Sequence, residues 1–162
     1  MQHTATAPPP TDGIRTWEAT YTGTADQVRR VRAWVRPLLG SCPVSDEVVM
    51  LISELCANAV LHSDSGKPGG RFTVRLRHLP GEWVRAEVQD QGKSTWDGDL
   101  ARSARHPHGL CLLLTLSTRC GIKHDTRSRT AWFWIDCPSH LASSATALSP
   151  VPPRTAVSAP PC

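Results

Sequence analysis

Three polar side chains with the chemistry to hold a metal ion or to move a proton follow one another at intervals of four residues: Glu54, Asn58 and His62. Residues four apart share one face of a helix, so the three would form a line beside an apolar stripe that begins at Val48. An amide oxygen suits the hard cation Mg²⁺, and a carboxylate can accept a proton. A solvated stripe at the edge of an apolar face has the same spacing, so spacing alone leaves both interpretations open.

Two further positions could contact a ligand. Asp90 continues the apolar alternation that begins at Val84, so its carboxylate points to the apolar side at the end of a strand and must accept hydrogen bonds there. An aspartate followed by Gln91 and Gly92 would equally well form a turn. Gly109 begins a short apolar helix, whose free N–H groups could hold a phosphate or could simply start the helix.

The elements that must position these side chains follow from the periodicity of the apolar residues. In chain order we expect a strand over 14–21, a helix after residue 24, a second helix up to residue 62, strands over 71–77 and 83–90, a short helix over 109–119, and strands over 122–124 and 129–136. This order predicts an α/β (α+β) two-layer sandwich, with the helices on one face of a mainly antiparallel mixed sheet.

Several residues predict where the helices begin and end. Thr24–Gln27 has the form of a capping box, and Pro37 predicts a kink or stop near Arg36. Ser45 is the expected N-cap of the second helix. Gly121 is the expected glycine after the last turn of the short helix.

The chain has 162 residues, which fits one domain with tails. Its 14 prolines gather at the two ends, so we expect disordered tails over 1–13 and 138–162 and a single domain over 14–137. The stretch 91–108 has no periodicity, and a segment of this kind inside a domain is often functional, as a lid is.

Charge and cysteine usage exclude several classes of protein. The net charge of +4 comes from scattered basic residues, which does not indicate a protein that binds nucleic acid directly. The six cysteines have no regular spacing, and the cysteines and histidines over 106–124 match no standard zinc pattern. The first residues lack the apolar segment of a signal peptide, and no apolar run is long enough for a membrane, so we expect a reduced, cytoplasmic protein.

Taken together, the motifs resemble those of the GHKL (histidine kinase-like) ATPase superfamily. The most specific part is Glu54-Leu-Cys-Ala-Asn58-Ala-Val-Leu-His62-Ser63, an ELxxNAxxHS pattern; it is followed by Asp90-Gln91-Gly92, His108-Gly109-Leu110 and Thr130. Within the superfamily the chain is most similar to the small anti-sigma-factor serine/threonine kinases and their actinomycete relatives. The resemblance covers residues 15–136 and implies the Bergerat form of the α/β sandwich.

The resemblance implies a role for each motif in a site for ATP and Mg²⁺. Glu54 would be the general base, and Asn58 would bind Mg²⁺ together with the ATP phosphates. Asp90 would accept the amino group of adenine, and Gly92 would let the base approach. Residues 93–108 would form the ATP lid, and the other positions near the nucleotide would be His62, His108, Gly109, Leu110 and Thr130.

The resemblance also implies partners. The protein would be a homodimer that phosphorylates a serine or threonine on a STAS-type anti-anti-sigma factor, binds a sigma factor, or does both. The chain departs from the family pattern at Ser94, at Pro107, which has no N–H for a phosphate, and at Ser128-Arg129-Thr130, where Gly-Lys-Thr is common. These departures favour an alternative, a non-catalytic ATP-binding interaction module that controls a partner protein.

Overall fold

The structure, a computed structural model, describes residues 13–92 and 110–137. The elements are β1 (Arg15–Thr22), α1 (Ala25–Leu39), α2 (Ser45–His62), a short 3-10 helix η1 (Asp64–Gly66), β2 (Arg71–Leu79), β3 (Trp83–Asp90), α4 (Leu110–Leu116), β4 (Arg119–His124) and β5 (Arg129–Asp136). The predicted lid over 93–108 lies outside the described residues, and so do nearly all of the two predicted tails.

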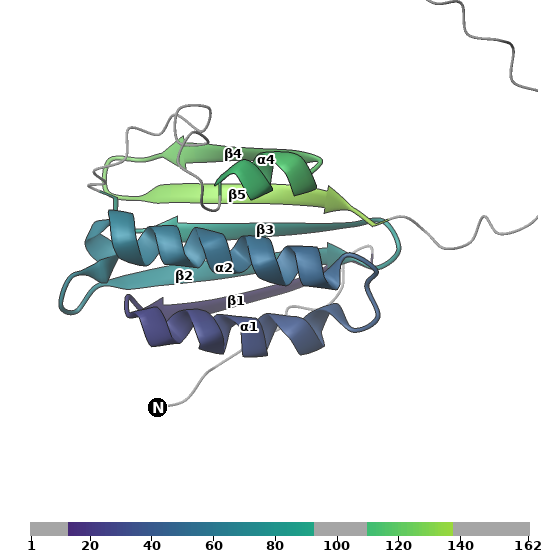
Figure 1. Ribbon diagram of the computed structural model, residues 1–162, viewed down its shortest axis with the longest axis horizontal. Helices are drawn as coiled ribbons and strands as arrows, with labels where there is room; N and C mark the ends of the chain where they lie inside the picture. Colours follow the sequence, from purple (N-terminus) through teal and green to yellow (C-terminus); the bar gives the residue numbers. More distant parts are fainter. Residues whose placement is uncertain (1–12, 93–109, 138–162) are drawn as a thin grey trace, which may run out of the picture.

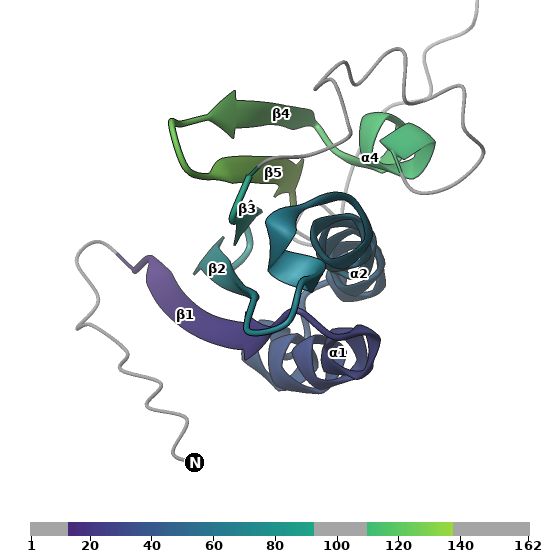
Figure 2. The ribbon, with the colours of Figure 1, turned by 90° about the vertical axis from the view of Figure 1, so that its left-hand side faces the viewer.

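The five strands form one sheet in the order β1-β2-β3-β5-β4, and each neighbouring pair is antiparallel. The described helices cover one face of this sheet (Figure 1), and the view along the strands shows the helix layer beside the sheet layer (Figure 2). The predicted α/β two-layer sandwich is therefore confirmed. None of the described helices has the length and apolar character needed to cross a membrane.

The core lies between the sheet and the helices, and the alternation of each strand decides which side chains enter it. On β2 the buried positions include Phe72, Val74 and Leu76, and the residues between them face the other side of the sheet. Val31 of α1 and Leu51 of α2 are fully buried in the same cluster. Each such side chain stabilises the fold by about 1.5–3 kcal/mol through the apolar surface it removes from water.

The start and end of α1 differ from the prediction. Thr24 is the N-cap residue, but its hydroxyl donates to the carboxylate of Asp26, 2.5 Å away, and makes no capping bond. Gln27 also donates to that carboxylate, so the predicted capping box is wrong. The helix does not stop at Arg36, because Pro37 lies inside its last turn and the helix continues to Leu39.

Two other predicted boundaries are also wrong. Ser45 is the first residue of α2 and Val44 is its N-cap. Gly121 does not follow the short helix, because α4 ends at Leu116 and Gly121 lies within β4, opposite Trp132 of β5. A Cβ atom at Gly121 would lie 2.9 Å from the indole of Trp132. The glycine is therefore needed for the approach of an aromatic ring.

This close approach predicts that Gly121→Ala destabilises the protein. The added methyl group must displace the Trp132 indole, and overpacking of this kind costs about 1–3 kcal/mol. Urea denaturation measures the loss of unfolding free energy. The control is Lys123→Ala, an exposed change on the same strand, whose free energy of unfolding should lie within about 0.5 kcal/mol of that of the natural protein. A Gly121→Ala protein as stable as the control would contradict the packing described here.

Candidate functional site

The end of α2 is fastened to the end of β3. The backbone N–H of Asp64, just after α2, donates to the carbonyl oxygen of Gly92 over 3.0 Å. The buried hydroxyl of Ser65 donates to the carbonyl of Arg71 over 2.6 Å and accepts from the N–H of Gln91 over 3.0 Å. These bonds place the last turns of α2 beside the stretch that follows Asp90.

Glycines allow the backbone to pack tightly around Ser65. A Cβ atom at Gly23 would lie 1.6 Å from the carbonyl oxygen of Ser65, and one at Gly70 would lie 2.2 Å from the same atom. A Cβ atom at Gly66 would lie 2.0 Å from the carbonyl oxygen of Val60. No side chain fits at these positions. The tight packing of the segment after α2, which fastens α2 to the end of β3, therefore requires these glycines.

The side chains predicted on α2 occupy different environments. Glu54 and Asn58 are half-buried, and His62 is exposed at the last position of the helix. The amide nitrogen Nδ2 of Asn58 is buried and has no hydrogen-bond partner among the described residues. A buried polar group without a partner costs about 1–3 kcal/mol, so this amide is a cost to the fold unless a ligand contacts the side chain.

Asp90 is buried at the end of β3 and forms an ion pair that the sequence analysis did not predict. Arg129, its direct partner in β5, donates to Oδ2 of Asp90 from Nε over 2.8 Å and from a terminal guanidinium nitrogen over 2.6 Å. The side chains of Asp90 and Arg129 are 3% and 2% exposed. Oδ1 of Asp90 accepts the N–H of Gly92 over 2.9 Å.

Arg129, rather than Thr130, lies on the face of Asp90. In β5 the buried positions are Arg129 and those two, four and six residues later, whereas Thr130 pairs with Gln89 on the face away from the helices. The signal for Arg129 was available in the sequence, because it shares the alternation of Ala131 and Phe133. The missing information was the register that sets Arg129 opposite Asp90.

Gly92 adopts the conformation that a glycine permits. Its φ angle is +69°, and a Cβ atom there would lie 3.4 Å from the backbone of Arg127 and Ser128. His108 and Gly109 lie outside the described residues. Leu110 is the first residue of α4. The structure thus brings together α2, Asp90 and Gly92, and it adds Arg129.

Comparison with known proteins identifies the family. The family model for the histidine kinase-like ATPase domain matches residues 20–133, most of the chain. The chain belongs to this family. The match extends from β1 to β5 and includes every predicted site residue.

A solved structure has the same fold. The structure of the RsbU and RsbW domains of Rv1364c from Mycobacterium tuberculosis matches this chain with a TM-score of 0.55 and 24% sequence identity. The match covers 78% of this chain and 34% of the other, so the chain spans about a third of that protein's length. No curated protein matches the chain.

Membership of the histidine kinase-like ATPase family implies a site for ATP, usually with Mg²⁺, and the residues present fit such a site. Asn58 offers an amide oxygen, the kind of ligand that Mg²⁺ takes, and an amide nitrogen that has no partner among the described residues and can donate to a phosphate oxygen. Asp90 uses Oδ2 for Arg129 and one bond of Oδ1 for Gly92, and a carboxylate can accept about four bonds. Among the described residues, one acceptor position on Oδ1 therefore remains for an amino group.

The electrostatics of Asp90 depend on Arg129. Burial raises the pKa of the Asp90 carboxyl above its usual value of 3.8, while the charge of Arg129 and the N–H of Gly92 act in the opposite direction. The arginine therefore favours the ionised carboxylate, the form that accepts hydrogen bonds from a ligand.

Removing the arginine should destabilise the protein in a pH-dependent way. Arg129→Met leaves Asp90 buried without its charge partner, which costs about 3–5 kcal/mol at neutral pH. The pKa of Asp90 then rises further above its value in the unfolded chain, so the folded state binds the proton more tightly and stability falls as the pH rises. The deficit relative to the natural protein should narrow as the pH falls through the raised pKa of Asp90 in the variant, and it should narrow no further below the pKa of Asp90 in the natural protein.

Denaturant unfolding across this pH range measures the effect, with Arg127→Met, an exposed arginine in the adjacent turn, as the control. A deficit for Arg129→Met that is absent, or that stays constant with pH, would contradict the role of the ion pair.

Proposed function

We propose that the protein is an ATP-binding regulatory protein that resembles the anti-sigma-factor serine/threonine kinases. The observation that carries the proposal is the buried amide nitrogen of Asn58, without a partner among the described residues, on the helix fastened beside Asp90 and Gly92. Family membership supports it. The structural similarity to a protein with an RsbW domain is in keeping with it.

Each side chain of the site has a role in this proposal. Asn58 binds Mg²⁺ and orients the phosphates, and Asp90 accepts the amino group of adenine. Glu54 is half-buried on the same helix face as Asn58 and has no partner among the described residues, so its carboxylate is available to accept a proton from a serine or threonine hydroxyl. ATP supplies the phosphoryl group when it is bound.

The proposed partners are proteins. The acceptor of the phosphoryl group is a STAS-type anti-anti-sigma factor, and a sigma factor competes for the same regulator. The protein acts as a homodimer in the cytoplasm, without direct contact to nucleic acid. These parts of the proposal rest on the ELxxNAxxHS pattern at Glu54–Ser63 and its resemblance to the anti-sigma-factor kinases.

The sequence favours the alternative of a non-catalytic ATP-binding module at one position. Pro107 stands where the family pattern has a glycine, and proline has no N–H to donate to a phosphate. Recognition of adenine by Asp90 does not depend on this position, so ATP could bind without transfer of its phosphoryl group. Binding of ATP that changes the affinity for a partner, without transfer of phosphate, would identify this alternative.

Loss of the Asn58 amide should separate ligand binding from stability. In Asn58→Ala we expect the affinity for Mg-ATP, measured by calorimetry, to fall by about tenfold or more, as weakened metal ligation does. The affinity for ATP in the presence of a metal chelator should change less. Because the amide nitrogen has no partner among the described residues, the free energy of unfolding without nucleotide should stay level or rise.

The matched control is Leu61→Ala, an exposed change on the same helix, which should leave the affinity for nucleotide unchanged. Unchanged Mg-ATP affinity in Asn58→Ala, or a destabilised protein without nucleotide, would contradict a ligand-binding role for Asn58.

Removal of the proposed general base should affect transfer and spare binding. Glu54→Gln should keep the affinity for Mg-ATP and lower the rate of phosphoryl transfer to a purified STAS-domain protein by about 10²–10⁴-fold. Transfer from radiolabelled ATP measures the rate, with Glu47→Gln in the first turn of α2 as the control. Transfer by Glu54→Gln at the natural rate would contradict the role of Glu54.

A further inference from the structure

Three side chains with the chemistry of metal ligands converge at the end of the sheet opposite Asp90. They are Cys42 in the connection between α1 and α2, His78 near the end of β2, and Cys137 just after β5. His78 pairs with Val84, and the six residue steps along β3 from Val84 to Asp90 correspond to about 20 Å of strand. The cluster is therefore separate from the proposed nucleotide site.

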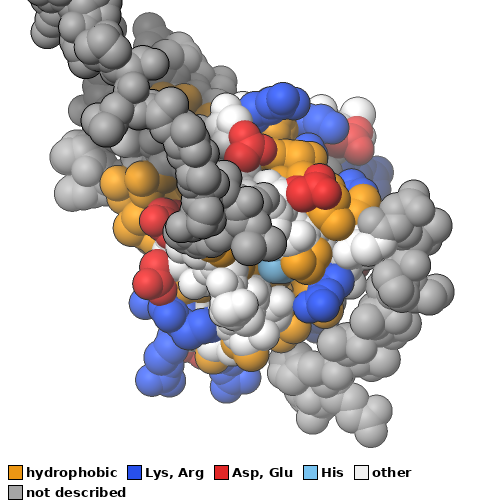
Figure 3. All heavy atoms as spheres, turned by 90° about the vertical axis from the view of Figure 1, so that its right-hand side faces the viewer, with side chains coloured by type: hydrophobic (Ala, Val, Ile, Leu, Met, Phe, Trp, Pro, Cys, Tyr) orange, Lys and Arg blue, Asp and Glu red, His pale blue; other side chains and the backbone are white. Residues whose placement is uncertain are grey.

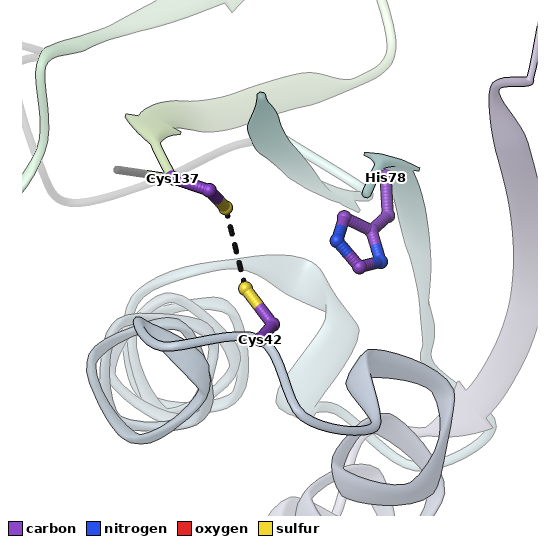
Figure 4. Close-up of side chains that lie close together, drawn as sticks. All are labelled: Cys42, His78 and Cys137. Carbon is purple, nitrogen blue, oxygen red and sulfur yellow. Dashed lines mark hydrogen bonds between the residues drawn. The ribbon is translucent and has the colours of Figure 1, made fainter. Parts of the chain in front are cut away.

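The cluster is buried and its ligand atoms are close together. The exposed fractions are 9% for Cys42, 3% for His78 and 4% for Cys137, and one ligand atom from each residue lies within 4.8 Å of the others. The two sulfur atoms are 3.2 Å apart. In Figure 4 the sulfurs point toward each other and the imidazole of His78 lies beside them.

The imidazole has a nitrogen that no described group satisfies. Nδ1 of His78 is buried and lacks a hydrogen-bond partner among the described residues. Burial, followed by the nearby charge of Arg15, lowers the pKa of His78. A buried polar nitrogen without a partner costs the fold free energy, and this imidazole lies beside two thiols.

The fold holds the three residues in this position. His78 lies in the buried phase of β2 after Phe72, Val74 and Leu76, and Cys137 continues the buried phase of β5 while its N–H donates to the carbonyl of Glu82 over 2.7 Å. Cys42 is held by a bond from its N–H to the carbonyl of Leu39. Figure 3 shows this end of the molecule, where part of a histidine side chain is visible among hydrophobic side chains.

The sulfur separation is closer to that of a metal site than to that of a disulfide. Two thiolates on a tetrahedral zinc ion, with Zn–S bonds of about 2.3 Å, lie about 3.8 Å apart. The 3.2 Å separation needs a small opening to reach that value. A disulfide needs the sulfurs to close to about 2.05 Å, a larger change than the opening that a metal requires.

We propose that Cys42, His78 and Cys137 bind Zn²⁺. Two thiolates and a neutral imidazole around a divalent ion give a site with no net charge, which suits a buried position. Three protein ligands leave a fourth position on the metal. The ion joins the α1–α2 connection to the ends of β2 and β5, segments up to 95 residues apart in the sequence, so it stabilises the fold at the end away from Asp90.

The test begins with the full chain, reduced, stripped of metal and kept without oxygen. We expect it to take up one Zn²⁺ per chain in competition with a chromophoric chelator. With Co²⁺ in place of Zn²⁺, we expect the near-ultraviolet charge-transfer absorption of thiolate–cobalt bonds. The metal should raise the thermal unfolding temperature, and its uptake should not depend on ATP.

Ligand variants assign the site. Cys42→Ser, Cys137→Ser and His78→Ala should each weaken Zn²⁺ binding by at least about tenfold, the loss that changes around a metal's ligands alone can cause. The matched control is Cys120→Ser, a half-buried thiol on β4 outside the cluster, which should bind Zn²⁺ as the natural chain does. If the ligand variants do not fold, the Co²⁺ spectra of the natural chain and of Cys120→Ser decide the question.

Several results would overturn the proposal. They are failure of the reduced chain to bind a stoichiometric Zn²⁺, a Co²⁺ complex without charge-transfer absorption, and unchanged affinity in the ligand variants. A Cys42–Cys137 disulfide in the isolated protein, with no uptake of metal after reduction, would assign the pair to a covalent link instead. None of these results bears on nucleotide binding, so the two sites are tested independently.

Discussion

The buried ion pair between Asp90 and Arg129 fixes how the two central strands meet at the proposed nucleotide site. Each charge would be too costly to bury alone, and the pair satisfies both only when β3 and β5 align in the observed register. The same carboxylate accepts the N–H of Gly92, and the carbonyl of Gly92 accepts the N–H of Asp64 after α2. The position of α2 against the sheet therefore depends on the Asp90–Arg129 ion pair, through the hydrogen bonds of Gly92.

The two ends of the sheet serve different purposes in this account. At one end, the last turns of α2 lie beside the stretch that follows Asp90. There the buried amide nitrogen of Asn58 has no hydrogen-bond partner among the described residues, so it is available to a ligand. At the other end, two thiols and an imidazole meet where the α1–α2 connection covers the ends of β2 and β5. Because α2 runs from one end to the other, a metal ion at its beginning would steady the helix that carries Glu54 and Asn58.

The features that the sequence predicts well are local. The alternation of β2 and β3 and the apolar stripe of α2 identify the buried faces, and the ELxxNAxxHS pattern identifies the family, which the family model confirms. The errors arise where a tertiary contact decides. The sequence pattern around Gly121 is typical of the end of a helix, but Gly121 lies against the Trp132 indole. The hydroxyl of Thr24 donates a hydrogen bond to Asp26 instead of capping α1.

The features that the sequence does not reveal are pairings over long separations. Asp90 and Arg129 are 39 residues apart in the sequence, and only the register of β3 and β5 makes them partners. The Cys42 and Cys137 thiols are 95 residues apart, so no short motif announces them. The spacing rules for zinc sites search the sequence locally and therefore miss a cluster that three separate elements assemble.

The most direct test of the central claim uses the fact that Asn58 is the only asparagine in the chain. Labelling with ¹⁵N-asparagine gives a side-chain amide signal that reports on this one site. The account predicts that saturating Mg-ATP shifts this signal, and that ATP with a metal chelator shifts it less. An amide signal that stays in place at saturating Mg-ATP would contradict the assignment of Asn58 to the nucleotide site.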